Sequence, residues 1–214
     1  MNTPSREAPI DPAHAALLIV DVQNYCAHPD GAGAHHLDSQ QHDYFFRRLL
    51  ETVLPNLQRL RSACRRAHIE IVYAAVENMT RDGRDRSLDY KISGIDVPRA
   101  SWDAQVLDEI APAEDEMIFR KTSSSVFIST NIDYVLRNLE VRSLIVAGMM
   151  TDQCVESAVR DACDLGYLVT LVTDACVTES AERHNQSLIG LRGYCRQRRT
   201  DAMLAEVAAL GGRS

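Results

Sequence analysis

The sequence predicts a three-layer α/β/α sandwich built around a six-stranded, mostly parallel sheet. Short apolar runs alternate along the chain with longer segments whose apolar residues recur at helical spacing. The strand candidates are apolar throughout, as in parallel strands that helices cover on both faces. The chain of 214 residues is long enough for one substantial core. We therefore expect a single domain over residues 1–214, with residues 1–14 as a flexible N-terminal segment.

Two strands and a long helix are expected before residue 101. The run AALLIVD at residues 15–21 is apolar and ends in Asp21. Apolar residues at helical spacing fill residues 43–67, where Pro55 predicts a kink or two abutting helices. The run IEIVYAAV at residues 69–76 is the second predicted strand. Residues 78–101 are polar and too many for a plain connection, so we expect a functional loop or a lid there.

The middle of the chain is expected to hold two strands and three helices. Residues 102–110 suit a short helix, residues 116–120 a third strand with Lys121 just past it, and residues 129–138 a helix. The fourth strand, residues 144–147, is broken by Gly148. Thr151 and Asp152 are typical N-cap and first-turn residues, so a helix is expected over residues 152–165 with Cys154 in its first turn.

The last part of the chain continues the alternation, with strands at residues 167–172 and 194–198 and helices at residues 181–191 and 200–210. Ligands of such sheets bind beyond the carboxyl ends of the strands, where the strand order reverses. Asp21, Glu77, Lys121 and Cys154 all lie at or just past predicted strand ends. We therefore expect these four residues to meet in one cleft.

Composition and charge narrow the range of partners. The formal net charge of -7 argues against nucleic acid or a membrane surface as a partner, and the basic residues at 192–199 are interpreted as a local patch. No segment approaches the length of a membrane span, and the first residues contain no apolar signal core. The cysteines are scattered without metal-type spacing, so we expect a reduced, cytoplasmic protein. Phosphate-loop and dinucleotide glycine patterns are absent, and no cofactor is expected.

Cys154 is the most informative residue of the chain. A thiol in the first turn of a helix meets free N–H groups and the positive end of the helix dipole, which lower its pKa and favour a nucleophile. A small buried side chain is an equally good interpretation of this segment alone. Asp21 is suited to take the thiol proton and return it to a leaving amine, and Lys121 to stabilise the thiolate. Taken singly, a turn acid and a surface lysine are the simpler interpretations of Asp21 and Lys121.

Three motifs in order, LLIVDVQN, FRKTSSSVF and VAGMMTDQCVESA, resemble the isochorismatase-like cysteine hydrolase superfamily over about residues 15–200. The resemblance implies a Rossmann-like fold and a catalytic triad of Asp21, Lys121 and Cys154. It also implies a cis peptide bond at Met150–Thr151, with an oxyanion hole formed by the amides of Met150, Thr151 and Cys154. A homo-oligomer, a dimer or tetramer, is a further implication of the resemblance.

The branch of the superfamily is indicated by two segments. The presence of Cys154 favours amide or ureide hydrolysis, because the vinyl-ether-cleaving isochorismatases lack this cysteine. The segment ENMTRDGRDRSLDYKISG resembles the ureidoacrylate, biuret and triuret hydrolases, which cut C–N bonds of small linear ureides. Metal-dependent relatives carry histidines at this point and this chain does not, so no metal is expected. The His and Asp side chains of the first loop are interpreted as solvated, and a metal site is the weaker alternative. These residues are His28, His35, His36, His42, Asp38 and Asp43.

Seven residues are candidate substrate-binding groups. Glu77 is suited to accept hydrogen bonds from a urea NH2, Lys91 to receive a carbonyl or carboxylate, and Gln197 to donate its amide to a carbonyl. A surface charge is the alternative interpretation for Lys91, and a structural hydrogen bond is the alternative for Gln197. The other candidates flank or wall the cleft: Asn24, Tyr25, Tyr90 and Phe127.

The sequence as a whole predicts a cysteine amidohydrolase that acts on a small linear ureide or amide through a thioester. Three alternatives stay open at this point. The chain could be an N-carbamoyl amino acid amidohydrolase, a vinyl-ether hydrolase in which Cys154 is dispensable, or a catalytically silent binding protein that uses the fold as a scaffold.

Overall fold

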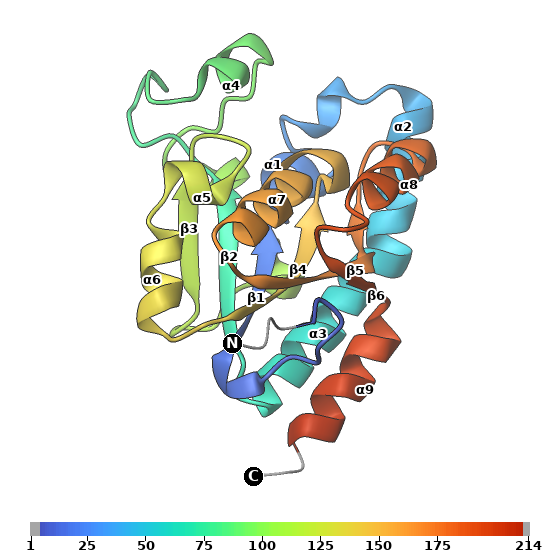
Figure 1. Ribbon diagram of the computed structural model, residues 1–214. Helices are drawn as coiled ribbons and strands as arrows, with labels where there is room; N and C mark the ends of the chain where they lie inside the picture. Colours follow the sequence, from blue (N-terminus) through green and yellow to red (C-terminus); the bar gives the residue numbers. More distant parts are fainter. Residues whose placement is uncertain (1–4, 212–214) are drawn as a thin grey trace.

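The computed structural model describes residues 5–211, which form one parallel sheet flanked by helices (Figure 1). The strand order is β3-β2-β1-β4-β5-β6, and every neighbouring pair is parallel. The predicted α/β class and six-stranded sheet are confirmed, and the sheet is fully rather than mostly parallel. The strands are β1 (Ala15–Val20), β2 (Glu70–Val76), β3 (Met117–Lys121), β4 (Ser143–Met149), β5 (Leu168–Val177) and β6 (Arg196–Arg198).

The centre of the sheet is formed by β1 and β4, and every residue of both strands is buried. From β1 the chain builds β2 and β3 on one side and then returns to place β4 on the other side of β1. The strand order therefore reverses between β1 and β4. In open α/β sheets the crevice outside such a reversal is where ligands bind.

Helices cover both faces of the sheet (Figure 1). α3 and α9 pack against each other and against β5, whereas α5 packs against α6 and α7. Because right-handed crossovers run in opposite directions on the two sides of the reversal, these two groups cover opposite faces. The helices described are α1 (Asn24–Ala27), α2 (Ser39–Arg48), α3 (Leu54–Arg66), α4 (Leu88–Ile92), α5 (Val126–Ser129), α6 (Ile132–Asn138), α7 (Glu156–Asp164), α8 (Ala181–Gly190) and α9 (Thr200–Gly211).

The predicted helix at residues 102–110 is wrong, because only two short 3-10 turns form there, Trp102–Ala104 and Asp108–Ile110. The backbone between these turns bonds to the loop after β1 instead of to itself. The N–H of Asn24 donates to Gln105 at 2.8 Å, and the N–H of Leu107 donates to Val22 at 3.1 Å. The segment thus closes over the end of β1 rather than forming a helix.

Two predicted helices are irregular in the structure. The long one runs in continuous helical backbone conformation as α2, a π-helical turn (Leu49–Val53) and α3, and the missing N–H of Pro55 removes one helical bond just after this turn. The helix expected over residues 129–138 is divided into α5 and α6. Pro55 therefore accompanies a local irregularity in one continuous helix rather than the start of a second helix.

The described part of the N-terminal segment packs onto the domain, unlike the flexible segment that the sequence predicts. Ile10 is buried, and its N–H donates to the Glu206 carboxylate at 2.9 Å. Arg6 donates to the carbonyl of Tyr194 at 3.0 Å, and Glu7 pairs with Arg198 at 2.8 Å. Residues 1–4 lie outside the described range. Within residues 5–211, no helix combines the length and the apolar character needed to cross a membrane.

Candidate active site

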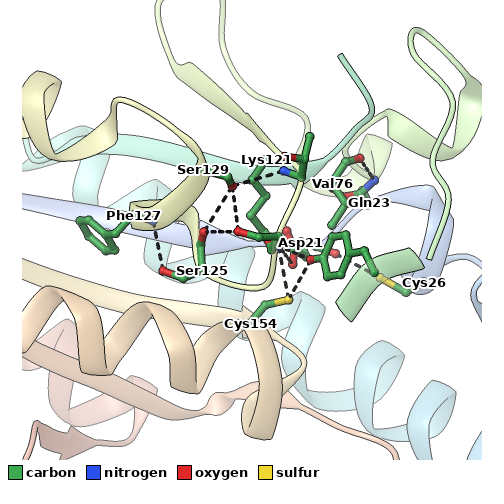
Figure 2. A network of polar contacts seen from close by, with 12 residues as sticks. Asp21, Gln23, Cys26, Val76, Lys121, Ser125, Phe127, Ser129 and Cys154 are labelled. Carbon is green, nitrogen blue, oxygen red and sulfur yellow. Dashed lines mark hydrogen bonds and ion pairs between the residues drawn. The ribbon is translucent and has the colours of Figure 1, made fainter. Parts of the chain in front are cut away.

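Three strand ends deliver the reactive side chains to one point. Asp21 follows β1 directly, in a left-handed backbone conformation (φ 55°) that Asp tolerates better than most residues. Lys121 is the last residue of β3 and pairs in register with Val76 of β2. Cys154 lies just beyond β4, the strand next to β1. Figure 2 shows Asp21, Lys121 and Cys154 pointing toward one another.

Lys121 is at the centre of the cluster. Its Nζ lies 2.9 Å from Asp21 Oδ2 and 3.3 Å from Cys154 Sγ. The same Nζ donates to the Tyr90 hydroxyl at 2.9 Å and to the Ser123 carbonyl at 3.0 Å. Lys121 comes from two strands beyond β1, so its long side chain must pass over the end of β2 to reach Asp21.

The cluster is a buried ion pair beside a buried thiol. Lys121 is 0% exposed, Asp21 is 2% exposed and Cys154 is 8% exposed. Apart from the ion pair with Lys121, neither carboxylate oxygen of Asp21 has a hydrogen-bond donor among the described residues. The carboxylate therefore keeps acceptor capacity for a proton from Cys154 or from a substrate.

Burial and mutual charge set the protonation states. Burial raises the pKa of Asp21 above its ordinary value, and the Lys121 ammonium offsets this only in part. Burial alone would lower the pKa of Lys121, but the Asp21 carboxylate holds it well above the ordinary value. Burial, followed by the charge of Asp21, raises the pKa of Cys154 to about 12. The thiol of lowered pKa that the sequence predicts is therefore corrected, because the resting site favours a protonated Cys154 beside the Lys121 ammonium.

Cys154 lies in a π-helical turn (Thr151–Val155) that leads into α7. The cis peptide bond is Met149–Met150, one residue earlier than the sequence predicts, because β4 continues through Gly148 and ends only at Met149. The predicted N-cap role of Thr151 is also wrong. Met150 occupies the cap without a side-chain bond, and Thr151 is buried inside the turn.

The turn is held from outside by α8 and α2. Arg48 of α2 can only donate, so His184 Nε2, 3.1 Å from its Nη2, must accept. His184 Nδ1 therefore carries the proton and donates to the Thr151 hydroxyl at 2.9 Å. Burial, reinforced by Arg48, lowers the pKa of His184 to about 4, which keeps the ring neutral near pH 7. The Ser187 hydroxyl lies 3.1 Å from the Thr151 carbonyl, but its single proton has a closer and charged acceptor in the Glu156 carboxylate at 2.6 Å.

Asp21 is supported on the other side by Gln23, a residue that the sequence analysis missed. Gln23 is fully buried, and its amide both donates to the Val76 carbonyl at 2.9 Å and accepts from the Val76 N–H at 2.6 Å. This bidentate pair, visible in Figure 2, joins the loop after β1 to the end of β2. The Gln23 amide thus makes the two hydrogen bonds that the backbone of a neighbouring strand would make. The N–H of Asp21 donates to Ala74 of the same strand at 2.9 Å.

A cavity of about 430 Å³ opens onto the cluster, a size that suits a small molecule. Asp21 and Cys154 form part of its wall, and two of the seven predicted substrate-binding residues, Tyr25 and Tyr90, line it. The rest of the wall is Cys26, Gly33, His36, Val76, Asp89, Ser93, Ile95, Ser124, Met150, Gln153 and Glu179.

The other five predicted substrate-binding residues are engaged outside this cavity. Asn24 donates its amide to the Trp102 carbonyl at 2.9 Å, and Lys91 donates its ammonium to the Arg84 carbonyl at 2.7 Å. Glu77 pairs with Arg120 at 2.9 Å. Phe127 packs on the Tyr167 ring, and Gln197 donates to the Leu188 carbonyl at 2.7 Å, which is the structural alternative given for it above.

Glu179 lines the cavity although the sequence analysis did not select it. The fifth strand was expected to end at residue 172, whereas β5 continues to Val177. With the observed end, the same strand-end rule that selects Asp21 and Lys121 points to Glu179. Among residues 5–211, no group of three or more His, Cys, Asp or Glu side chains is arranged to hold a metal ion. In the first loop, His28 stacks on Trp102 and His42 on Phe46.

The chain was also compared with known proteins. A family model described as "Isochorismatase domain" matches residues 15–203. A cysteine hydrolase from Pseudomonas syringae pv. phaseolicola 1448A is similar with a TM-score of 0.82 and 25% identity, over 98% of this chain and 100% of that one. An isochorismatase-like hydrolase from Alkaliphilus metalliredigens has a TM-score of 0.72, at 22% identity over 89% and 97% of the two chains. N-carbamoylsarcosine amidase from Thermoplasma acidophilum has a TM-score of 0.70, at 22% identity over 88% and 97%. At 22% identity these last two likenesses concern the fold alone.

Proposed function

The chain belongs to the isochorismatase-like cysteine hydrolase family, and from that premise we propose that it hydrolyses a C–N bond of a small linear ureide or amide. The observation that carries the proposal is the buried cluster itself. A thiol lies 3.3 Å from an ammonium that is paired with a carboxylate, and both the thiol and the carboxylate line a cavity. These are the groups that acyl transfer through a thioester requires.

In the proposed reaction, Asp21 accepts the proton of Cys154 as the sulfur attacks the substrate carbonyl. Its raised pKa makes it a stronger base than an exposed carboxylate, which suits proton transfer from a thiol. Lys121 keeps its positive charge and compensates the negative charge on the sulfur. Asp21 then gives the proton to the leaving nitrogen as the C–N bond breaks. Water attacks the thioester, with Asp21 accepting one of its protons, and the thiol returns.

The oxyanion of the tetrahedral intermediate needs donors, and we assign them to the amides of Met150, Thr151 and Cys154. Support comes from the turn geometry. Among the described residues, neither the N–H of Met150 nor that of Thr151 donates to an acceptor. Met150 and Cys154 both line the cavity. The bond from His184 holds Thr151 in place.

The substrate class within this proposal is a ureide of the ureidoacrylate, biuret or triuret type, with N-carbamoyl amino acids as the second candidate. The fold likeness to N-carbamoylsarcosine amidase is compatible with that second candidate. Asp89 places a carboxylate on the cavity wall, where Glu179 is paired with Arg183, and carboxylates accept N–H groups and repel other carboxylates. We therefore rank biuret and triuret above the two substrate types that carry a carboxylate. Homo-oligomerisation and a cytoplasmic location remain predictions from the sequence.

The test is ammonia release from purified protein over biuret, triuret, ureidoacrylate, N-carbamoyl amino acids and small amides. The best substrate is then assayed with Cys154→Ala and Cys154→Ser, and the acyl adduct is sought by mass spectrometry. Full turnover by Cys154→Ala would contradict the proposal. Absence of turnover together with an unreactive Cys154 thiol would favour a binding protein.

A further inference from the structure

We propose that Tyr90 is a catalytic residue that donates a hydrogen bond from its phenol to the Cys154 thiolate, and that the loop of residues 78–101 holds it there. The inference rests on the proposed function of Cys154 as nucleophile. Tyr90 was expected from the sequence to contact substrate, and the structure places its hydroxyl among the reacting groups instead. Its oxygen lies 2.9 Å from Lys121 Nζ and 3.6 Å from Cys154 Sγ.

The first step of the argument concerns the hydrogens of Lys121. An ammonium has three N–H groups. Three oxygen acceptors lie closer to Nζ than the sulfur does, namely Asp21 Oδ2 at 2.9 Å, the Tyr90 hydroxyl at 2.9 Å and the Ser123 carbonyl at 3.0 Å. Nζ donates hydrogen bonds to the Tyr90 hydroxyl, the Ser123 carbonyl and Cys154 Sγ, the last at 3.3 Å, and it attracts Asp21 Oδ2 as an ion pair. Lys121 thus gives the sulfur one donor, and a second donor stabilises the charged thiolate further.

The second step concerns the proton of Tyr90. Since the hydroxyl oxygen accepts from Lys121, its own hydrogen must point elsewhere. Cys154 Sγ is the other hydrogen-bond partner of this hydroxyl within the described residues. Tyr90 is 1% exposed, so its hydroxyl has little contact with bulk solvent. Burial, followed by the charge of a Cys154 thiolate, raises the pKa of Tyr90 above its ordinary value, so the phenol keeps the proton that it offers.

The third step concerns how Tyr90 is held. It lies on the short helix α4, where its own N–H donates to the N-cap hydroxyl of Ser87 at 3.1 Å. The N–H of Ser87 donates in turn to Thr122, the residue after Lys121, at 2.9 Å. The loop is therefore fastened to the end of β3 next to the ammonium that Tyr90 contacts. A change in the loop is transmitted to the sulfur through this phenol.

The chemical consequence is that the Tyr90 hydrogen bond lowers the pKa of the Cys154 thiol. When Asp21 takes the Cys154 proton, the Tyr90 O–H bond to sulfur strengthens, because a bond to a charged acceptor is stronger than one to a neutral acceptor. No proton leaves Tyr90, so the reaction remains balanced by Asp21 alone. The same hydrogen bond stabilises the sulfur as leaving group when the thioester is hydrolysed.

The test is the pH dependence of Cys154 alkylation by iodoacetamide, followed by mass spectrometry of the Cys154 peptide. This readout needs no substrate, so it can fail while the hydrolase proposal stands, and the reverse also holds. Tyr90→Phe keeps the ring and removes the donor. We expect the apparent pKa of Cys154 to rise by about one unit, and alkylation at fixed pH to slow about tenfold, as loss of one bond to a charged group implies.

The matched control is Tyr73→Phe, which removes the hydroxyl of another buried tyrosine, one that bonds to Glu116 and contacts neither Lys121 nor Cys154 through hydrogen bonds. Its alkylation profile is expected to match wild type. Ser87→Ala removes the cap of α4, keeps the phenol and is expected to shift the Cys154 pKa in the same direction by a smaller amount. A Tyr90→Phe profile equal to wild type overturns the proposal. If that variant does not fold, an unshifted Ser87→Ala profile overturns it instead.

Discussion

The cluster around Cys154 draws on two regions that are built differently, the carboxyl edge of the sheet and the loop of residues 78–101. Asp21, Lys121 and Cys154 follow strands whose positions are set by continuous backbone pairing. Tyr90 comes from a loop fastened by side chains, such as Asn78 to Asp96 at 2.6 Å. The comparison suggests a division of roles. The reacting groups lie where the backbone cannot shift without breaking the sheet. The group that adjusts the thiol pKa, Tyr90, lies in a loop whose position a single substitution can change.

The strongest test of the sheet edge is removal of one member of the buried ion pair. Lys121→Met is expected to lower turnover about 10²- to 10³-fold, the range for loss of a group that stabilises developing charge. It is also expected to lower the free energy of unfolding by about 3–5 kcal/mol, because Asp21 is left buried without a counter-charge. Turnover assays and urea unfolding measure the two effects.

The matching control is the double variant Asp21→Asn/Lys121→Met. It removes both charges, so most of the lost free energy of unfolding should return while turnover does not. A double variant as unstable as Lys121→Met would contradict the interpretation of the pair as mutual charge compensation. Near-wild-type turnover in either variant would contradict the proposed roles of Asp21 and Lys121.

The pH dependence of unfolding tests the same pair. The folded-state pKa of Asp21 is raised above its ordinary value of 3.8, so folding favours the protonated acid. Its contribution to stability is fully present below pH 3.8 and is lost as the pH rises through the folded-state pKa. Without the Lys121 ammonium the folded-state pKa rises further. Urea unfolding between about pH 4 and pH 8 should therefore show a steeper loss of stability with pH in Lys121→Met than in wild type.

Gly148 tests how closely the two central strands must approach at the site. Its φ is +123°, and an added Cβ would lie 2.2 Å from the Val20 carbonyl oxygen, inside the β1 backbone. Gly148→Ala is expected to cost about 3 kcal/mol or more in unfolding free energy and to reduce turnover, because β4 must move away from β1. Gly166→Ala is the control: its φ of +93° is also positive but nothing lies within 4 Å. Equal losses in the two variants would contradict the close-approach argument.

A substitution of Thr151 tests whether α8 supports the π-helical turn that contains Cys154. Thr151→Val keeps the shape but leaves the buried His184 Nδ1 proton without an acceptor, at a cost of about 1–3 kcal/mol. We expect kcat to fall about tenfold with KM little changed, because the amide of Thr151 acts on the oxyanion rather than on the ground state. Steady-state kinetics with the best substrate gives kcat and KM separately. A change confined to KM would argue against the oxyanion role.

The sheet edge was largely predictable from the sequence, because an apolar run that ends in a polar residue marks both a buried strand and its carboxyl end. Asp21, Lys121 and Cys154 were found by that rule, whereas Glu179 was not. The predicted fifth strand ends at residue 172, whereas β5 continues to Val177. In the structure Asp174 accepts from both the N–H and the hydroxyl of Thr200, at the start of α9, and so remains within β5.

The thiol pKa and the loop could not be predicted in this way. A helix N-terminus favours a thiolate, but burial and the nearby Asp21 carboxylate have the larger effect on Cys154, and both depend on tertiary contacts. The segment of residues 78–101 has no periodic pattern that sets its path. Tyr90 and Lys91 were equal candidates by position, yet Tyr90 is buried at the sulfur and Lys91 is directed to the Arg84 carbonyl. Only the packing of the short helix α4 separates them.

A substitution of Asp85 has the smallest expected effect, and it tests the loop of residues 78–101 separately from the sheet. Its carboxylate accepts from the N–H groups of Met79 and Thr80, at 2.8 and 2.9 Å, and from the Thr80 hydroxyl. Burial is the largest single effect and by itself would raise the pKa of Asp85, but these bonds together outweigh it and lower that pKa to about 2. The order that Asp85 gives the loop is thus present above pH 3.8 and lost as the pH falls through about 2.

Asp85→Asn keeps one oxygen acceptor and loses the charge, so amide hydrogen exchange in residues 78–101 should quicken at neutral pH. Exchange in β1 and β4 should not change, because the sheet does not depend on this carboxylate. Turnover should fall only a few-fold, through a less well held Tyr90. Asp82→Asn is the control, since exposed Asp82 pairs with Arg84 and makes none of the contacts to Met79. If neither Asp85→Asn nor Asp82→Asn changed amide hydrogen exchange in the loop, side-chain bonds would not be what holds Tyr90 at the sulfur. The proposed difference between a loop held by side chains and a sheet held by backbone pairing would then be contradicted.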